Sequence, residues 1–379
     1  MKFYHKYYEP ISSYKPEKRE IISRAESALI IKPPHITDSI APDSAGGRHD
    51  FFSQADYSWP DPNTSDGLPF INRDGESYPG AFFEHRKAMR RMRTSVAYFT
   101  AAYTFTKDVR YSKAASLWLK EFFLDEETMM MPSLLYSQAI LGRCTGRGIG
   151  IIDTLHLIDV PICADILFEN GQMDGAIYSG LKDWFSKYLN WICTHQYGID
   201  EMNTKNNHSV CWLVQATVFA RFSENDEVLE MCISRYKNTI LPNQMAVDGS
   251  FPLELERTKP YGYTIFVLDN LATLCYLLST PKDNLWEFTL PDGRNMKKGI
   301  DYLYTYLDDK TIWPHKHDIA CYDEWPVAMS FMLFAAASYG ESKWLDLYSR
   351  LEKFPNNDEV RRNTAIRVPW LWIYPYNVY

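Results

Sequence analysis

Apolar residues recur at helical spacing along most of this chain, and this pattern limits the fold more than any other feature of the sequence. In 109–124, apolar side chains follow Tyr111 at three, four, seven and eleven residues, so they lie on one face of an amphipathic helix. The same pattern predicts further helices over 17–31, 84–106, 150–168, 173–195, 205–222, 224–239, 261–279, 296–308, 326–339 and 342–354. Alternating strands are scarce, so the sequence predicts an all-α fold.

Short connections between these segments favour antiparallel helical hairpins stacked into an α/α toroid. The 379 residues exceed a typical domain, but helical toroids reach this length as one unit. No flexible linker or low-complexity tract interrupts the chain, so we expect a single domain over 1–379. Two irregular segments, 43–80 and 240–260, stand out, and we expect them to form loops over a cleft because long irregular segments are usually functional.

Composition excludes several classes of protein. The net charge of −8 argues against a nucleic-acid binder, and no apolar stretch is long enough to predict a membrane span. Seven cysteines occur singly, which argues against a disulfide framework or a zinc ribbon. His315 and His317 form the only close histidine pair, and their spacing does not place both on one helix face, so we expect no metal site. Aromatic residues reach 15%, which suits a cleft that stacks on sugar rings.

The first motif is TKNNHSVCWLVQ at 204–215, which reads as a polar loop entering a helix. His208 and Trp212 lie on one face of that helix, four residues apart. The cluster of Asn206, Asn207 and His208 offers amide donors beside a titratable imidazole. The alternative is a helix N-cap followed by a buried histidine whose hydrogen bonds are satisfied.

The second motif is DGSFPLELERTKPYGY at 248–263. Arg257 and Tyr263 lie six residues apart across a proline and a glycine, so we expect the chain to turn between them. An arginine beside a tyrosine favours the phenolate, and it can also bind a carboxylate. The alternative is a surface arginine paired with Glu254 or Glu256 beside a half-buried tyrosine.

Two further segments carry candidate cleft residues. In GGRHDFFSQADYSWPDP at 46–62, aromatic rings could stack on a sugar while Arg48 and His49 donate hydrogen bonds; the alternative is that these rings anchor the segment on the helices. In 132–154, the run GRGIG lacks the spacing and the preceding strand of a dinucleotide-binding loop. We interpret Gln138, Arg143 and Arg147 as cleft residues instead.

The chain resembles the alginate lyase superfamily. The resemblance rests on HDFFSQADYSWPDP, NNHS and DGSFPLELERTKPYGY, in that order within residues 45–340, and the first motif is similar to that of Bacteroides-type members. It implies an α/α toroid that cleaves 1,4-linked uronic-acid polymers, most often alginate, by β-elimination and without a cofactor. It also implies export, with a signal removed, although MKFYHKYYEP lacks a secretory apolar region and the single cysteines suit a cytoplasmic protein.

The resemblance also implies residue roles. Asn207 and Arg257, with His208, would neutralise the uronate carboxylate, and Tyr263 would act as base, acid or both. Because the arginine-to-tyrosine spacing varies among relatives, Tyr261 and Asn206 remain competitors. Expected substrate-binding residues are Arg48, His49, Tyr57, Trp59, Arg73, His85, Arg86, Gln138, Arg147, Trp212 and Tyr261.

Other activities remain open at this stage. A glycoside hydrolase on a similar toroid needs two carboxylates beside the scissile bond. Its candidates are Asp153, Asp200, Glu201, Glu254, Asp323 and Glu324. A sugar-binding protein without activity would keep Tyr57 and Trp59, and a glucuronan lyase would use the same catalytic residues. We expect an anionic polysaccharide or oligosaccharide as partner, with oligomeric state and endo or exo action undetermined.

Overall fold

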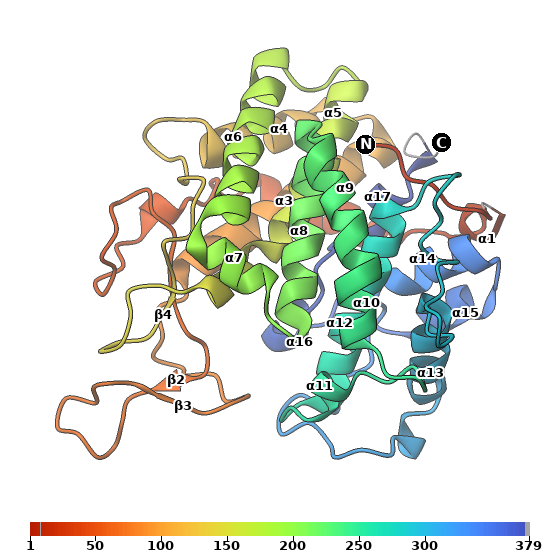
Figure 1. Cartoon of the computed structure of the whole chain (residues 1–379). Coiled ribbons are helices and arrows are strands. Elements are labelled where there is room, and N and C mark those ends of the chain that lie inside the picture. The colour runs from red at the N-terminus through yellow and green to blue at the C-terminus, as the bar shows by residue number, and fades with distance from the viewer. Residues whose placement is uncertain (8, 376–379) are drawn as a thin grey trace.

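The computed structural model describes residues 1–7 and 9–375, and helices dominate it (Figure 1). The longer helices are α2 (Lys18–Leu29), α3 (Glu84–Thr106), α4 (Val109–Phe123), α5 (Asp159–Glu169), α6 (Gly175–Thr194), α7 (Gln196–Met202), α8 (Asn207–Ser223), α9 (Asp226–Arg235), α12 (Pro260–Leu278), α13 (Met296–Asp308), α14 (Ser330–Tyr339) and α15 (Lys343–Arg350). The shortest are α1 (Glu9–Ser12), α10 (Leu241–Gln244), α11 (Pro252–Leu255), α16 (Asp358–Arg362) and α17 (Pro369–Trp372).

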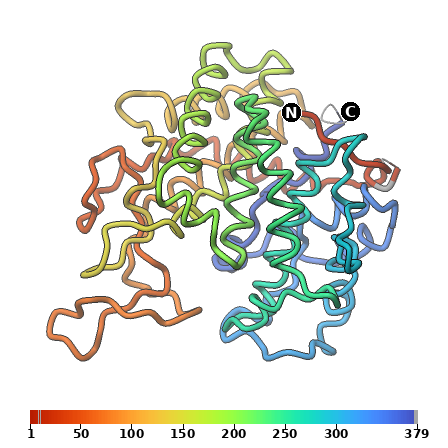
Figure 2. The backbone as a smooth tube through the Cα atoms, viewed as in Figure 1, coloured from red at the N-terminus to blue at the C-terminus, as the bar shows by residue number. Residues whose placement is uncertain are grey.

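The helices form an α/α toroid, as the sequence predicts. The helices pack on one another in chain order, some pairs being separated by other helices: α2 lies on α3, α3 on α4, α6 on α8, α8 on α12, and α12 on α14. Nearly every residue of α12 and α14 is buried, whereas α13 and α15 bury one stripe. The inner helices are therefore apolar all round, and the outer ones are amphipathic. Figure 2 shows the resulting path of the chain.

The strands are short and lie in the first part of the chain. Strand β1 (Phe52–Gln54) pairs in parallel with β4 (Tyr136–Ala139), and β2 (Ser58–Trp59) pairs antiparallel with β3 (Ile71–Asn72). The β2–β3 hairpin projects from the helices in Figure 1. This hairpin lies within the irregular segment 43–80 that the sequence singles out.

Several predicted boundaries need correction. The predicted helix 150–168 begins as a 3-10 helix over Gly148–Ile158 and becomes α-helical only in α5, and α9 passes into a π-helical turn at Tyr236–Ile240. The segment 240–260 is not wholly irregular, because it contains α10 and α11. Each starts with a proline in its first turn, where a missing N–H costs little. The prediction of one domain over 1–379 stays a prediction, and Tyr8 and residues 376–379 lie outside the described residues.

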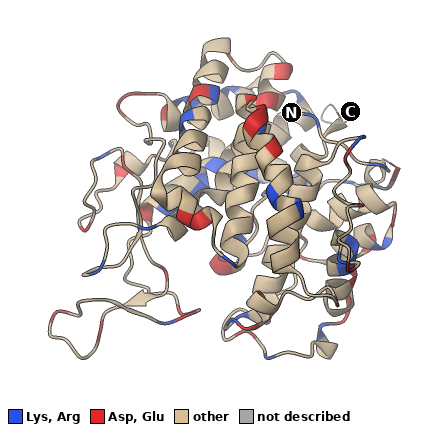
Figure 3. Ribbon diagram, in the orientation of Figure 1, with Lys and Arg blue, Asp and Glu red and all other residues tan. Residues whose placement is uncertain are grey.

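Helix α12 is long and apolar enough to cross a membrane by length and composition alone. However, 94% of its most apolar window is buried inside the protein, as in the core helix of a globular fold. Charged residues of both signs are interspersed along the helices and loops in Figure 3.

Candidate active site

A cavity of about 420 Å³ opens where segments from most of the chain meet. Its walls come from the loop and hairpin over 56–74, α3, β4 and the loop after it, the 3-10 helix Gly148–Ile158, the starts of α8 and α12 with the loops before them, and the end of α16. Its volume falls within the range of about 300–1,000 Å³ that is usual for small-molecule sites. The predicted residues that line it are Tyr57, Gln138, Arg147, Asn206, Asn207, His208, Arg257 and Tyr263, together with the hydrolase candidate Asp153.

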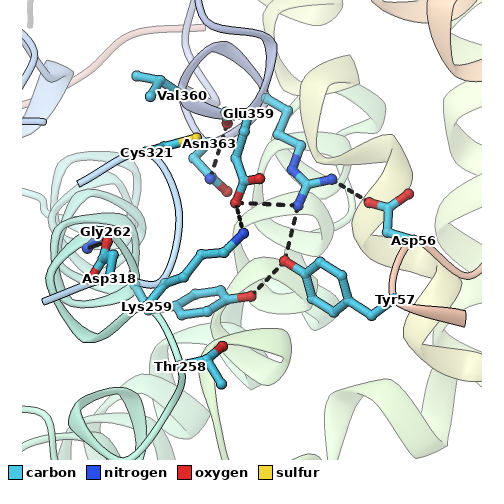
Figure 4. Close-up of polar contacts among 12 residues, drawn as sticks. Asp56, Tyr57, Thr258, Lys259, Gly262, Asp318, Cys321, Glu359, Val360 and Asn363 are labelled. Atoms are coloured by element: carbon cyan, nitrogen blue, oxygen red, sulfur yellow. Dashed lines mark hydrogen bonds and ion pairs between the residues drawn. The ribbon is translucent and has the colours of Figure 1, made fainter. Parts of the chain in front are cut away.

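Two tyrosine hydroxyls meet at the centre of a polar network (Figure 4). The hydroxyls of Tyr57 and Tyr263 are 2.8 Å apart and share a hydrogen bond. Arg257 donates to the Tyr263 hydroxyl at 3.2 Å, and Arg362 donates to the Tyr57 hydroxyl at 3.0 Å. The paired hydroxyls therefore lie between two guanidinium groups, that of Arg257 beside Tyr263 and that of Arg362 beside Tyr57.

Arg257 is held by the hairpin rather than by its sequence neighbours. It forms an ion pair with Asp74 at 2.8 Å, and the same carboxylate accepts a hydrogen bond from Thr258 at 3.0 Å. The alternative that Arg257 pairs with Glu254 or Glu256 is wrong. Gly75 follows with φ +81°, and a β-carbon there would lie 2.4 Å from the Thr258 hydroxyl, so glycine allows this close approach.

The pKa of Tyr263 is raised, whereas the sequence predicts that the neighbouring arginine lowers it. Burial raises the pKa of Tyr263 well above its ordinary value, and the nearby Tyr57 adds to this. Arg257 and Arg362 lower the pKa, as an adjacent cation should, but they do not outweigh burial. In the empty cavity Tyr263 is therefore a neutral phenol at neutral pH.

Asn207 is fixed by a buried carboxylate. Its backbone N–H and its side-chain amide each donate to Glu254, both at 2.8 Å. Glu254 is fully buried, and burial raises its pKa although both hydrogen bonds oppose this. The preceding residue, Asn206, is the N-cap of α8 and accepts from the backbone N–H of His208 at 3.3 Å. The N-cap alternative thus applies to Asn206, while Asn207 faces the cavity.

His208 rests on a second buried carboxylate, Glu201 of α7, whose oxygen lies 2.7 Å from Nδ1. Burial lowers the pKa of His208, but Glu201 outweighs burial with help from Glu254, and the net direction is upward. Glu201 and Glu254 are two candidates of the hydrolase alternative. Each is committed to a neighbouring side chain, and neither lines the cavity.

The other wall of the cavity contains Gln138 and Arg147. Arg147 donates to the Gln138 carbonyl at 3.0 Å and to its side-chain oxygen at 3.2 Å. Trp59 does not line the cavity; its indole N–H donates to the Glu76 carbonyl at 2.8 Å, and the Arg73 guanidinium lies 4.7 Å from its ring. Trp59 and Arg73 therefore support the hairpin instead of facing the centre of the cavity.

The structure places the remaining predicted residues away from the cavity. Trp212 is fully buried and donates to the Ile192 carbonyl, and Tyr261 is fully buried and donates to the Tyr306 carbonyl. Both are core residues, so Tyr261 is not positioned to compete with Tyr263. Arg48 and Arg143 are exposed, and His49 is half-buried and hydrogen-bonded to the Met129 carbonyl. His85 is buried and accepts from the Phe52 N–H, and Arg86 is buried and paired with Asp153.

Several residues of the site carry no local signal in the sequence. Asp74 and Arg362 bind site residues that are far away in the chain, and Arg90 and Asn363 line the cavity. In the sequence, Glu201 is a candidate only as a hydrolase carboxylate. Arg90 lies within the predicted helix 84–106, and the sequence does not indicate that it faces a site. Among residues 1–7 and 9–375, no group of three His, Cys, Asp or Glu side chains is arranged to hold a metal ion.

Comparison with known proteins identifies the family and the fold of the chain. The alginate lyase family model matches residues 35–313. The crystal structure of an alginate lyase from Bacteroides ovatus superposes with a TM-score of 0.83 and 28% identity, covering 97% of this chain and 96% of that chain. Alginate lyase A1-III from a Sphingomonas species has a similar fold, with a TM-score of 0.53, 13% identity and 96% of each chain covered. A histidine-to-alanine variant of A1-III, complexed with a tetrasaccharide, superposes with a TM-score of 0.50, 13% identity and 94% of each chain covered.

No curated protein sequence matches the chain. The family match nevertheless spans most of the 379 residues and contains all four predicted catalytic residues. The chain belongs to the alginate lyase family and is a polysaccharide lyase.

Proposed function

We propose that the protein cleaves alginate, a 1,4-linked polyuronate, by β-elimination at the cavity around Tyr263. One observation carries the proposal: the Tyr263 hydroxyl, 3.2 Å from Arg257, lines the same cavity as Asn207 and His208. These groups supply what elimination beside a carboxylate needs, namely charge neutralisation and a proton carrier.

Asn207 and Arg257 bind the carboxylate of the uronate that reacts. The proton on C5 is only weakly acidic while this carboxylate is fully charged, so donors directed at its oxygens lower the barrier to the enolate-like intermediate. Arg257 keeps its charge because Asp74 holds its pKa above the usual range despite burial. Glu254 anchors Asn207 by two hydrogen bonds, so the amide is oriented before substrate arrives.

Tyr263 moves the protons. Burial keeps Tyr263 a phenol in the resting site, and its minor phenolate form is the base. The phenolate removes the C5 proton, and the C5–H electrons form the C4–C5 double bond as the C4–O bond breaks. The same hydroxyl returns the proton to the leaving oxygen. Arg257 and Arg362 favour the phenolate form, and the hydrogen bond between the Tyr57 and Tyr263 hydroxyls gives the proton a second oxygen.

His208 provides a base for the opposite face of the sugar. Nδ1 is held by Glu201, so Nε2 is the nitrogen left for substrate. Mannuronate and guluronate differ in the side from which the C5 proton leaves. One cavity with Tyr263 and His208 as separate bases therefore suits both epimers.

The test offers polymannuronate, polyguluronate and glucuronan separately and follows ultraviolet absorbance of the 4,5-unsaturated uronate. We expect a rise with polymannuronate, and a second rise with polyguluronate if His208 serves the other epimer. A rise with glucuronan alone would replace alginate as the substrate. New reducing ends without ultraviolet absorbance would overturn β-elimination, because hydrolysis forms no double bond.

A further inference from the structure

An unbalanced charge cluster lies against the cavity, beside the tyrosine pair. Among the described residues it contains four cations, Lys259, Arg86, Arg90 and Arg362, and three carboxylates, Asp56, Asp153 and Glu359. Counting the ionised groups leaves one positive charge without a carboxylate. Uncompensated charge is costly in a buried position, so such an excess points to an anion that completes the site.

All three carboxylates of this cluster are engaged, and Glu359 pairs with Lys259 and lies 3.6 Å from Arg362. The two oxygens of Asp56 pair with Arg86 and Arg362. One oxygen of Asp153 accepts from Arg86 at 2.9 Å and from Ser53 at 2.6 Å, while the other lies 3.5 Å from the Gln138 amide. The ion pairs of the cluster therefore hold Arg86 and Arg362, and they leave Arg90 out.

Arg90 is the unpaired member. Among the described residues, no carboxylate lies within ion-pair distance of its guanidinium, and its buried Nε has no hydrogen-bond partner. Burial, together with repulsion from Arg86, lowers the Arg90 pKa to about 10, so it still carries its charge at neutral pH. The other cavity arginines are occupied: Arg257 by Asp74 and Arg147 by Gln138.

The neighbour on the cavity wall does not supply the missing anion. His156 lines the cavity beside the arginines, and burial together with Arg93 and Arg90 lowers its pKa well below the ordinary value. It is therefore a neutral imidazole that contributes no negative charge. An anion entering the cavity would meet Arg90 with its donors free.

We propose that Arg90 is an anion-binding subsite for the carboxylate of a second uronate, adjacent in the polymer to the one held by Asn207 and Arg257. This inference rests on the proposed function. A guanidinium binds a carboxylate through two parallel hydrogen bonds, which fixes the sugar's orientation as well as its charge. The enzyme then requires charge on two neighbouring sugars, and a polymer in which uronates alternate with neutral sugars is a poor substrate.

The test compares Arg90→Gln with Arg91→Gln, a matched change at the next, exposed position of α3. Substrates are a mannuronate tetrasaccharide and a set of the same oligomers with one carboxyl group reduced to the alcohol. In the wild type and in Arg91→Gln, one reduced oligomer should show KM raised roughly 10- to 100-fold, the effect of losing one hydrogen-bonded charge. In Arg90→Gln the intact oligomer should already have the raised KM. Reducing the same carboxyl group should then raise the KM of this variant no further.

Two outcomes overturn the subsite. One is an unchanged KM in Arg90→Gln for the intact oligomer. The other is a further, equal rise in the KM of Arg90→Gln for every reduced oligomer, which would indicate that Arg90 is purely structural. Thermal unfolding checks that Arg90→Gln folds; if it does not, Arg90→Lys, which keeps charge but not the bidentate geometry, should show an intermediate KM. Calorimetric binding of the intact tetrasaccharide separates the two proposals. Suppose that Arg90→Gln binds the tetrasaccharide more weakly than Arg91→Gln does, and that the wild type forms no unsaturated product. The subsite would then stand, and β-elimination would be rejected.

Discussion

At the scale of single residues, the site depends on two buried glutamates behind the start of α8. Glu254 holds Asn207 and Glu201 holds His208, and both carboxylates are fully buried. Asn207 and His208 line the cavity, whereas Glu254 and Glu201 do not. The two buried carboxylates therefore orient Asn207 and His208 from the side away from the cavity. The side chains that would contact substrate are thus positioned before it binds, which reduces the ordering cost of the reaction.

Tyr263→Phe should abolish elimination while polymer binding stays nearly intact, because only the hydroxyl is lost. The measurement is ultraviolet absorbance together with calorimetric binding of a mannuronate oligomer. Tyr261→Phe is the matched control: its hydroxyl donates to the Tyr306 carbonyl in the core, so activity should persist with about 1 kcal/mol lost from the free energy of unfolding. Turnover by Tyr263→Phe would remove Tyr263 from the chemistry.

Glu201→Gln should lower the pKa of His208. The carboxylate is the main group that raises this pKa against burial, so without it the imidazolium is less stable and the proton leaves at lower pH. NMR titration of the imidazole measures the shift, and the acidic limb of the activity profile on polyguluronate should move the same way. Glu256→Gln, a change at an exposed position, should leave both unchanged. An unaltered His208 titration in Glu201→Gln would contradict the pairing.

At the scale of elements, buried polar contacts fix how the inner helices meet. Asp269 of α12 accepts from the Ser330 hydroxyl at 2.8 Å and from the Phe331 N–H at 2.9 Å, both through one oxygen. It thereby caps the N-terminus of α14, where backbone N–H groups lack partners. Asp318 in turn caps the N-terminus of α12 by accepting from the N–H groups of Tyr261 and Gly262. This second cap sets the direction in which α12 carries Tyr263.

Asp269→Asn should stabilise the protein at neutral pH. Burial raises the pKa of Asp269 from 3.8 to about 6, so the folded state favours the protonated acid. The stability from this group is present below the unfolded pKa and is lost as pH rises to about 6. Asparagine keeps an oxygen for both hydrogen bonds, so we expect a gain of about 1 to 3 kcal/mol at pH 7 and almost none at pH 4. Thermal unfolding at both pH values decides; an equal effect at both would contradict the titration.

At the scale of the whole molecule, the cavity is closed by contacts between segments from opposite ends of the chain. Asp56 and Tyr57 lie in the early loop, and Arg362 of α16 binds both. Arg86 and Arg362 hold the pKa of Asp56 down to about 2 although burial raises it. Lys259 pairs with Glu359 and ties the same short helix to the start of α12 (Figure 4). The end of the chain is thereby part of the site.

Arg362→Gln should lower kcat, because Tyr57 loses its cationic donor and the Tyr57–Tyr263 pair is less well placed. We expect a decrease of roughly tenfold or more, in line with the loss of a hydrogen bond to a charged group. Arg361→Gln is the matched control, since Arg361 is exposed and pairs only with its neighbour Asp358 on the same helix. Equal rates in the two variants would show that α16 contributes nothing to the chemistry.

The sequence by itself determined the helices and the central motifs. The predicted bounds 84–106 and 296–308 coincide with α3 and α13, because strong apolar periodicity leaves little choice of secondary structure. The Asn207–His208 pair and the Arg257–Tyr263 pair are close in the chain, so their grouping could be read from local spacing. The resemblance to alginate lyases rested on these same motifs.

Only the tertiary structure decided which side chains share the cavity. Tyr261 lies beside Tyr263 in the same motif but points into the core, because residues two apart on a helix face different sides. Trp212 lies on the face of α8 that carries His208, but one turn further along the helix, where the core covers it. Asp74, Glu201 and Arg362 reach the site across long stretches of chain. Ion pairs and buried hydrogen bonds depend on distances between atoms that sequence spacing does not determine, so folding alone brings these partners together.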